Sequence, residues 1–395
     1  MFDVTRQPLM TRPTFRRTRT ILAAATLCTV ATGLAGCGSG SEPTPPRTTS
    51  TAPAPTTPAT DPNQPASGAP SSSSATPSGG SSAASPTNGA AIRVDPTLPR
   101  YDSSSSVTGN IKSVGSDTMN NLMALWGEDF QSLHPSVTIE VEGKGSSTAP
   151  PALIAGTSTF GPMSRAMKSS EIDEFEAAFG YKPLPIRTAI DMLAVFVHKD
   201  NPIAATGLTL EQVDGIFSET RRSGADEIRT WGDLGLTGEW ADKPISLYGR
   251  NSASGTYGYF KSVGLFKGDF KPTVKEQPGS SAVIQGVASD RYAIGYSGIG
   301  YATADVIALR IADKNSPISA AVAPRPEDAA DYPLARFLYL YVNYRPGSDL
   351  PPLQGEFVQF VLSADGQQAV IKDGYIPVAG AIARADREKL NLPAD

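Results

Sequence analysis

Short apolar segments typical of strands alternate with amphipathic helical segments along residues 107–395, and this alternation constrains the fold more than any other feature. The expected strands, rich in β-branched and aromatic residues, are 137–143, 191–198, 244–250, 292–298 and 336–344. The expected helices include 116–135 and 208–219, each with an apolar stripe. In the second helix, Thr209 and Gln212 form a capping-box pattern. Interleaved strands and helices predict an α/β fold with largely parallel sheets.

The N-terminal part of the chain looks like a targeting segment. Residues 12–20 carry four arginines and no acid, and an apolar run follows that ends at Cys37. This order is typical of a secretory signal peptide. The letters LAGC over 34–37 resemble the bacterial lipoprotein cleavage motif, which predicts a signal peptide at 1–36 and a lipid on the Cys37 thiol. An ordinary secretory signal with an incidental cysteine is the alternative, and the Arg16-Arg17 pair leaves a twin-arginine route open.

A Ser/Thr/Pro/Ala-rich tether is expected over residues 37–107, starting with the lipidated Cys37. Between Gly38 and Ile92 there are only three charged residues and no aromatic or large aliphatic residue, so this stretch cannot bury enough apolar surface to offset the entropy of ordering it. Cys28 would leave with the signal peptide, so the mature chain forms no intramolecular disulfide. Loss of the signal peptide, with five arginines and one aspartate, takes the formal charge from −5 to −9, which disfavours nucleic-acid binding.

Four short loops in the globular part are rich in Ser, Thr and Gly. They are loop 1 (GSDTM, 115–119), loop 2 (GKGSST, 143–148), loop 3 (FGPMSR, 160–165) and loop 4 (RNSASGTY, 250–257). A small-residue loop that leads into a helix offers free backbone N–H groups, and the helix dipole there favours an anion. Hydroxyls add donors, and Arg250 can contact two oxygens of a tetrahedral anion. One such loop is more often only a helix cap, but four together indicate an anion site.

Patterns for catalysis or metal binding fail in this chain. The P-loop pattern breaks at Gly145, and the nucleophile-elbow pattern breaks at Ile299. His134 and His198 are the only histidines, and they lack ligand spacing, so we predict no metal, no cofactor and no catalytic residue. The residues supply donors for an anion without an evident nucleophile, which favours binding over catalysis.

The loops and their flanks resemble those of a known family. GSDTM, GKGSSTAPPAL, FGPMSR, AVFVHKDNP, YGRNSASGTYGYFK and AIGYSGIGYA together resemble the phosphate-binding proteins of bacterial phosphate ABC transporters, over about residues 108–380. The resemblance implies a type II periplasmic-binding-protein fold, in which two α/β lobes joined by two crossover strands close on phosphate in the interlobe cleft. On this basis we expect lobe 1 at 108–197 plus 331–395 and lobe 2 at 198–330, with 191–198 and 336–344 as crossovers.

The resemblance also implies which residues bind phosphate. The expected ligands are Thr118, the backbone of Met119, Ser146, Ser164, Asp191, Arg250, Ser254, Gly255 and Thr256, and the secondary candidates are Ser116, Asp117, Ser147 and Arg165.

Loop 3 departs from the family pattern. Many members carry an aspartate there that accepts the proton of hydrogen phosphate, whereas this chain has Ser164 followed by Arg165. A buried acceptor rejects sulfate, because sulfate has no proton to donate at neutral pH. Asp191 is the favoured replacement, since similar members with Ser-Arg in loop 3 have an aspartate at this strand start. Asp117 is the other candidate. The alternative roles are an ion pair with Arg165 for Asp191 and a helix cap for Asp117.

We therefore expect a monomeric, membrane-anchored lipoprotein in the periplasm or at the cell surface. It would bind inorganic phosphate without a cofactor and deliver it to the permease subunits of an ABC transporter. Three alternatives stay open: a phosphomonoesterase on the same scaffold, a binder of another tetrahedral oxyanion such as sulfate, molybdate or arsenate, and an adhesion or phosphate-sensing lipoprotein that works without a transporter.

Overall fold

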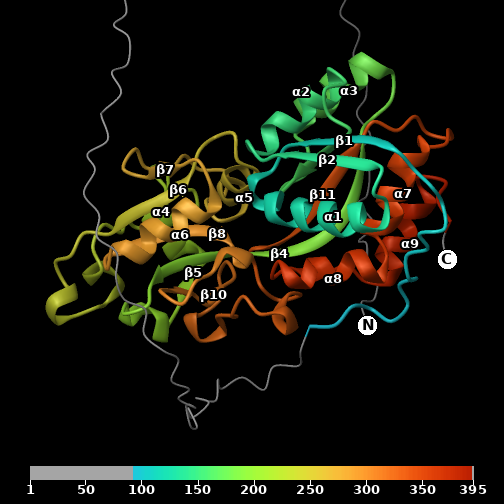
Figure 1. The fold of residues 1–395 in the computed structure, drawn as a ribbon. Helices are drawn as coiled ribbons and strands as arrows, with labels where there is room; N and C mark the ends of the chain where they lie inside the picture. Colours follow the sequence, from blue (N-terminus) through green and yellow to red (C-terminus); the bar gives the residue numbers. More distant parts are fainter. Residues whose placement is uncertain (1–91, 394–395) are drawn as a thin grey trace, which may run out of the picture. The chain divides into compact units, whose positions relative to one another are not determined.

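The computed structural model describes residues 92–393 (Figure 1). The expected signal peptide, the lipidation site at Cys37 and residues 37–91 of the expected tether lie outside the described residues. Residues 92–107, which we expected within the tether, pack on the folded body instead. Leu98 and Val107 are buried, and the Tyr101 hydroxyl donates to the Glu356 carboxylate at 2.9 Å. The folded body therefore begins earlier in the chain than the composition indicated.

The strands follow the sequence-based expectation closely. They are β1 Gly109–Val114, β2 Val137–Glu142, β3 Phe160–Met163, β4 Leu184–His198, β5 Leu208–Thr209, β6 Ser246–Arg250, β7 Lys275–Gln277, β8 Ala293–Gly298, β9 Val306–Ala308, β10 Ile311–Ala312, β11 Ala335–Val342 and β12 Ile376–Pro377. All five expected strands are confirmed as β2, β4, β6, β8 and β11. The largest difference is in β4, which begins at Leu184 rather than at Asp191.

The helices lie between these strands. They are α1 Asn120–Leu133, α2 Ala149–Ile154, α3 Ser169–Phe179, α4 Leu210–Phe217, α5 Gly255–Val263, α6 Ser280–Ser289, α7 Pro352–Val361, α8 Ala364–Lys372 and α9 Gly380–Glu388. Both expected helices are confirmed, as α1 preceded by the 3₁₀ turn η1 (Asp117–Met119) and as α4. The capping box at α4 is present, with Thr209 and Gln212 bonding each other's backbone.

The strands form a mixed sheet rather than a largely parallel one. Its order is β2-β1-β3-β11-β4-β8-β6-β7, with β12 and β9 also paired to β4, while β10 and β5 form a separate two-stranded sheet. The two outer parts of the main sheet are parallel, but β11 runs antiparallel to β3 and β4, and β4 runs antiparallel to β8. The prediction of parallel pairing therefore fails in the centre, because the chain returns there through β11 from a distant part of the sequence.

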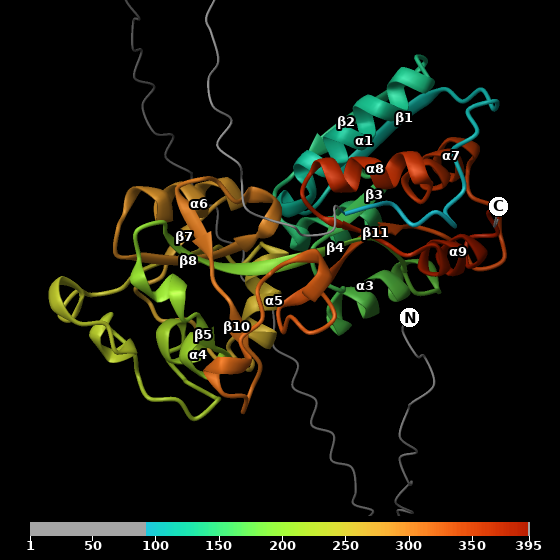
Figure 2. The ribbon, with the colours of Figure 1, turned by 90° about the horizontal axis from the view of Figure 1, so that it is seen from below.

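β4 connects two hydrophobic cores. Its first part, residues 184–192, pairs with β11, and its second part, residues 193–198, pairs with β8 and β9. One core surrounds α1, α7 and α8 and contains Trp126 and Phe357. The other surrounds α4 and α5 and contains Trp231. Figures 1 and 2 both show β4 running from the neighbourhood of α8 and α9 toward β8.

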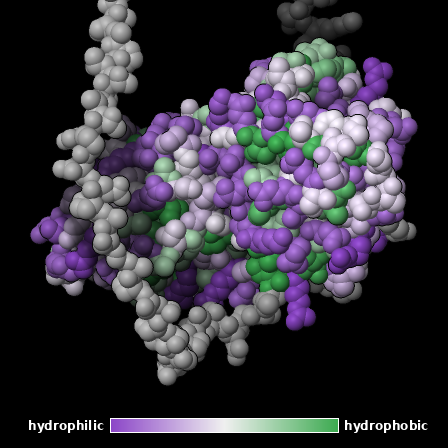
Figure 3. Space-filling view, in the orientation of Figure 1, coloured by the Kyte–Doolittle hydropathy of each residue, from purple (hydrophilic) through white to green (hydrophobic). Residues whose placement is uncertain are grey.

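The surface carries no broad apolar band on the face drawn in Figure 3, where apolar residues form small groups among hydrophilic ones. Within residues 92–393, Leu133 and Ile318 are the large hydrophobic side chains that stay exposed. No helix in this range has the length and apolar character needed to cross a membrane.

Candidate functional site

Loops 1, 2 and 3 meet through backbone hydrogen bonds. The Gly145 N–H donates to the Gly115 carbonyl at 2.7 Å, and the Ser116 N–H donates to the Pro162 carbonyl at 2.8 Å. Each of the three loops lies at the carboxyl end of a strand in the parallel group β2-β1-β3. Because the carboxyl ends of parallel strands lie at the same edge of a sheet, the loops are neighbours. The topology of the sheet therefore brings together three segments that are dispersed in the sequence.

Ser146 and Ser164 form the polar centre of loops 2 and 3. Both side chains are fully buried. The Ser164 N–H donates to the Ser146 hydroxyl at 3.0 Å, and the two hydroxyl oxygens lie 3.3 Å apart. Either hydroxyl can donate to the other, so one proton of the pair stays available to a ligand.

Loop 4 comes from the other core and contacts the first three loops. Its helix, α5, begins at Gly255, and the Ser254 hydroxyl caps it by accepting from the backbone N–H groups of Thr256 and Tyr257. The Thr256 hydroxyl lies 2.9 Å from the Thr118 hydroxyl of loop 1. All four loops that we singled out in the sequence therefore lie at one place in the structure.

Gly255 lets the start of α5 approach the two serines. A methyl group on its Cα would overlap the Ser146 hydroxyl and lie 2.5 Å from the Ser164 hydroxyl. Because no side chain fits there, the Gly255 backbone at the N-terminus of α5 lies directly against the hydroxyls of loops 2 and 3. This is the arrangement expected for amides and hydroxyls that surround a small anion.

Arg250 is the cation of the site and is almost completely buried, with 1% of its surface exposed. One terminal nitrogen donates to the Ser280 hydroxyl at 2.6 Å, and the other donates to the Pro278 carbonyl at 3.2 Å. The first nitrogen also lies 3.1 Å from the Asp117 carboxylate. Burial lowers the pKa of Arg250, while the negative charge of Asp117 opposes that change.

Asp117 bridges loop 1 and α6. Its carboxylate accepts from the Ser280 N–H at 2.8 Å in the first turn of α6, in addition to pairing with Arg250. Asp117 therefore does serve at a helix N-terminus, but at α6 rather than at its own helix, α1, where no side-chain cap is present. Tyr301 supports the same loop, since its hydroxyl donates to the carbonyls of Asp117 and Thr118.

Asp191 pairs with Arg336, which corrects the alternative ion pair with Arg165. The Arg336 guanidinium donates twice to one Asp191 oxygen, at 3.0 and 2.7 Å, and the other oxygen accepts from the Ile299 N–H at 3.2 Å. Arg165 is held elsewhere by two short bonds to Glu171, at 2.7 and 2.6 Å. Glu171 is only six residues from Arg165, and this local partner outcompetes the distant one.

Two further candidates make contacts that occupy the groups we expected to bind the anion. The Met119 N–H donates to the Ser116 carbonyl at 3.2 Å within η1. The Ser147 hydroxyl accepts from Arg165 at 3.1 Å, and its N–H donates to the Ala253 carbonyl of loop 4 at 3.0 Å. Ser147 and Arg165 therefore join loops to one another, beside the cluster of buried hydroxyls.

Three buried polar atoms at these loops have no hydrogen-bond partner among residues 92–393. They are the Ser116 hydroxyl, the Nε of Arg250 and the Nη1 of Arg336. Leaving a buried donor unpaired costs about 1–3 kcal/mol, and more for a charged group. Three unpaired buried donors around one cluster of loops indicate a binding site for a ligand that accepts hydrogen bonds.

The sequence interpretation missed Arg336 and Ser280. Arg336 is the one charged residue in the apolar segment 336–344, and a charge in a buried strand signals a buried partner. Ser280 begins a helix after Gly279, so it resembles the four loops, but no adjacent strand pattern drew attention to it. In the described part of the chain, no group of three or more His, Cys, Asp and Glu residues could hold a metal ion.

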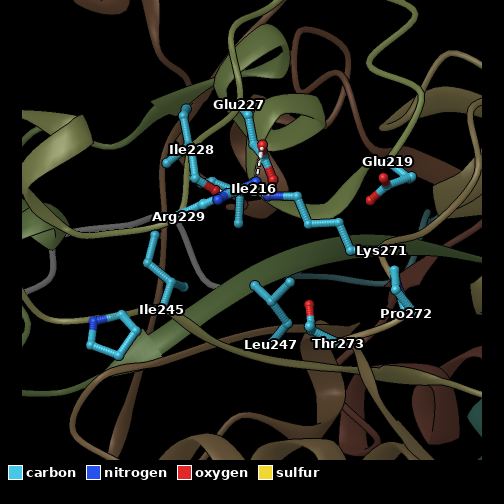
Figure 4. Close-up of a pocket in the computed structure, with 11 residues that line it drawn as sticks. Ile216, Glu219, Glu227, Ile228, Arg229, Ile245, Leu247, Lys271, Pro272 and Thr273 are labelled. Atoms are coloured by element: carbon cyan, nitrogen blue, oxygen red, sulfur yellow. Dashed lines mark hydrogen bonds and ion pairs between the residues drawn. The ribbon is translucent and has the colours of Figure 1, made fainter.

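A separate pocket lies on the second core (Figure 4). It has a volume of about 370 Å³, and its lining includes Glu227, Lys271 and Leu247. The lysine is already committed, because its ammonium group donates to the carbonyls of Gly215 and Ile228 at 3.1 and 2.8 Å. The pocket contains none of the four loops, and we assign Lys271 a structural role.

Comparison with known proteins identifies the class of protein. The family model described as "PBP superfamily domain" matches residues 100–365. The phosphate-binding protein PstS of Pseudomonas aeruginosa is 53% identical over 306 residues, which cover 77% of this chain and 94% of that protein. PstS of Staphylococcus haemolyticus is 28% identical over 264 residues, or 66% of this chain and 79% of that protein. The chain belongs to the PBP superfamily and, within it, to the family of the phosphate-binding protein PstS.

Solved structures agree with the fold. A proposed phosphate ABC transporter substrate-binding protein from Clostridium perfringens, with bound phosphate, matches with a TM-score of 0.57 and 26% identity, over 68% of this chain and all of that chain. An ABC-type phosphate transport receptor from Vibrio cholerae matches with a TM-score of 0.52 and 24% identity, again over 68% and all of the respective chains. The expected type II periplasmic-binding-protein fold is thereby confirmed.

Proposed function

We propose that this protein binds inorganic phosphate among its four loops and passes it to the permease of a phosphate ABC transporter. The observation that carries the proposal is the meeting of the four loops, where Thr118, Ser146 and Arg250 lie with unpartnered buried donors. Amides, hydroxyls and a guanidinium are the groups that hold a tetrahedral anion by hydrogen bonds. The relatives named for phosphate binding, and the Clostridium perfringens structure with phosphate bound, support this choice of anion.

The proposed ligands are Thr118, Ser146, Ser164, Arg250, Ser254, Gly255 and Thr256, with Asp191 as the acceptor for the phosphate proton. We also propose the Met119 N–H, which must leave its bond to the Ser116 carbonyl to take part. The position of Asp191 beside loop 1 supports that role. A methyl group on Gly298 would lie 3.2 Å from both Asp191 oxygens and 3.4 Å from the Thr118 methyl group, so Gly298 is in contact with both residues. Asp117 is the other carboxylate beside the loops, and it is engaged by Arg250 and the Ser280 N–H much as Asp191 is engaged by Arg336 and the Ile299 N–H. The site works by binding, and the protein is not an enzyme.

The domain and localisation predictions belong to the same proposal. We place lobe 1 at 108–197 plus 331–395 and lobe 2 at 198–330, and we expect the lobes to close on phosphate. The two separate cores and the passage of β4 between them support this division. We further propose export by the signal at 1–36, membrane anchoring through lipid on Cys37, action as a monomer outside the cytoplasm, and contact with the permease subunits.

The test is calorimetry of the purified protein with phosphate and with sulfate. We expect tight phosphate binding and sulfate binding at least about 10- to 100-fold weaker, because a buried acceptor facing sulfate leaves about 1–3 kcal/mol or more uncompensated. Arg250→Gln should abolish measurable phosphate binding while the protein stays folded. Equal affinity for the two anions would reject phosphate as the cognate ligand, and hydrolysis of p-nitrophenyl phosphate that needs Arg250 would favour a phosphomonoesterase.

A further inference from the structure

Asp191 and Arg336 lie directly opposite each other on β4 and β11, the two antiparallel strands at the centre of the sheet. Their side chains are almost fully buried, at 0% and 2% exposure, and Arg336 donates to one Asp191 oxygen from both Nε and Nη2. The simplest reading is an ion pair that ties two strands together. An ion pair of this kind explains the positions of Nε and Nη2, but it gives no partner to Nη1.

The contacts of Arg336 extend beyond the strand pair into the four loops. Its Nη2 also donates to the Thr256 hydroxyl at 2.9 Å. That hydroxyl lies 2.9 Å from the Thr118 hydroxyl. Arg336 therefore touches loop 4 directly and loop 1 through one oxygen, although it belongs to neither and no loop pattern in the sequence includes it.

The third nitrogen of this guanidinium, Nη1, is buried and bonds to nothing in residues 92–393. Arg250 has the same property at Nε. The two cations are close enough for the charge of Arg336 to contribute to lowering the pKa of Arg250. Each cation has its own aspartate, Asp117 for Arg250 and Asp191 for Arg336, so each offers an unused donor in a locally neutral setting.

We propose that Arg336 is a second guanidinium ligand of the bound anion, with Nη1 donating to a phosphate oxygen while Asp191 and Thr256 fix the orientation of the group. This inference rests on the proposed phosphate-binding function and adds a ligand that neither the sequence motifs nor the four loops contain. An arginine held by an aspartate is pre-organised, so little side-chain entropy is lost when its remaining N–H binds phosphate.

The competing role for Nη1 is on the other side of the guanidinium. Arg336 also lines a pocket of about 450 Å³ together with Tyr259 and Phe337, and its guanidinium carbon lies 5.4 Å from the centre of the Tyr259 ring. If Nη1 serves this pocket, Arg336 influences phosphate only through Asp191 and the Thr256 hydroxyl. A double-mutant cycle removes the contribution made through Asp191, because it measures the effect of Arg336 when Asp191 no longer carries its charge. The phosphate-bound structure described below decides whether Nη1 itself contacts the anion.

The experiment measures phosphate affinity by calorimetry and melting temperature for four proteins: the unaltered protein, Asp191→Asn, Arg336→Gln and the double variant. We expect Arg336→Gln to weaken phosphate binding about 10- to 100-fold in the Asp191→Asn background, as for loss of a charge-assisted hydrogen bond. The double variant leaves no unpaired buried charge, so it should fold even if Arg336→Gln alone does not. A change below about twofold in that background would overturn the inference.

Arg187 and Asp386 provide the matched control. They form a second arginine–aspartate pair, which joins β4 to α9 with bonds at 3.0 and 2.8 Å and contacts none of the four loops. Arg187→Gln with Asp386→Asn should lower the melting temperature and leave the phosphate affinity unchanged.

A crystal structure of the unaltered protein with phosphate gives a direct readout. We expect Nη1 of Arg336 within about 3.2 Å of a phosphate oxygen. Phosphate bound with Nη1 turned toward Tyr259 would refute the inference and leave the proposed function intact. If the unaltered protein binds no phosphate in calorimetry, the proposed function itself fails.

Discussion

The hydroxyl oxygens of Thr118 and Thr256 lie 2.9 Å apart, although 138 residues separate them in the chain. Thr118 belongs to η1 beside the first core, and Thr256 belongs to α5 beside the second. Either hydroxyl can donate to the other, so one proton of the pair stays available to a ligand. The pair is therefore both a contact between the two halves of the fold and a part of the proposed phosphate site.

Thr118→Val tests the ligand half of this relationship. The substitution replaces one hydroxyl by a methyl group of similar size, and we expect phosphate affinity to fall about 10-fold or more, since a hydrogen bond to a charged group contributes about 1.5–3 kcal/mol. Calorimetry measures the change. Thr188→Val is the matched control, because Thr188 is equally buried but donates to the Leu338 carbonyl within the sheet. An effect on phosphate binding as large in the control as in Thr118→Val would contradict the prediction.

Gly255→Ala tests the close approach of α5 to loops 2 and 3. The added methyl group would overlap the Ser146 hydroxyl, so we expect phosphate affinity to fall by at least about 100-fold, as for the loss of two charge-assisted hydrogen bonds. Gly258→Ala, one turn further along α5, is the control. Its methyl group would meet only the Cδ and Nε of Arg165, at 3.2 and 3.4 Å, and alanine favours a helix by about 1 kcal/mol over glycine. Gly258→Ala should therefore bind phosphate normally.

The four loops could be predicted from the sequence, because each combines small hydroxyl residues with a neighbouring strand or helix signal. The strand and helix periods around Thr209 and over 336–344 were equally clear. These features are local, since every residue needed to recognise them lies within about ten positions. A local pattern of this kind predicts its helix or strand correctly when the apolar residues of the pattern are also the ones that the fold buries.

The partner of Asp191 could not be predicted in the same way. Arg336 lies 145 residues further along the chain, and only the register of β4 against β11 brings the two opposite each other. A one-residue slip in that register would turn every side chain to the other face, and no sequence pattern in either strand sets it uniquely. Arg165 was the nearer choice in the sequence, but Glu171 binds it within the same local segment.

Salt dependence tests whether the charges of the site are balanced. Arg250 and Arg336 are each paired with an aspartate inside the protein, where screening by salt is weak. We expect phosphate affinity to change less than about threefold between low and physiological ionic strength. Asp117→Asn removes one negative charge and should make the affinity fall more steeply with added salt. A steep dependence in the unaltered protein would mean that unpaired surface charges dominate binding.

The final prediction concerns Asp373, whose carboxyl lies at the end of α8. Burial, together with the negative charge of Asp191, raises the pKa of Asp373 to about 7. One of its oxygens has no hydrogen-bond partner in the described part of the chain. Because the unfolded chain releases this proton near pH 4, the folded protein holds more protons between pH 4 and pH 7. The contribution of Asp373 to the free energy of unfolding is therefore greatest at low pH and is lost as the pH rises through 7.

Asp373→Asn should remove this loss, since asparagine stays neutral. At about 1.4 kcal/mol per pKa unit the upper bound is about 4 kcal/mol, and partial solvation of the carboxyl reduces our expectation to about 1–3 kcal/mol. Denaturant unfolding at pH 5, 6, 7 and 8 measures it: the variant should gain stability relative to the unaltered protein as the pH rises. Asp349→Asn, at an exposed position, is the control and should run parallel to the unaltered protein. If Asp373→Asn also runs parallel, the carboxyl is already ionised at pH 5, and its neighbours must stabilise the charge.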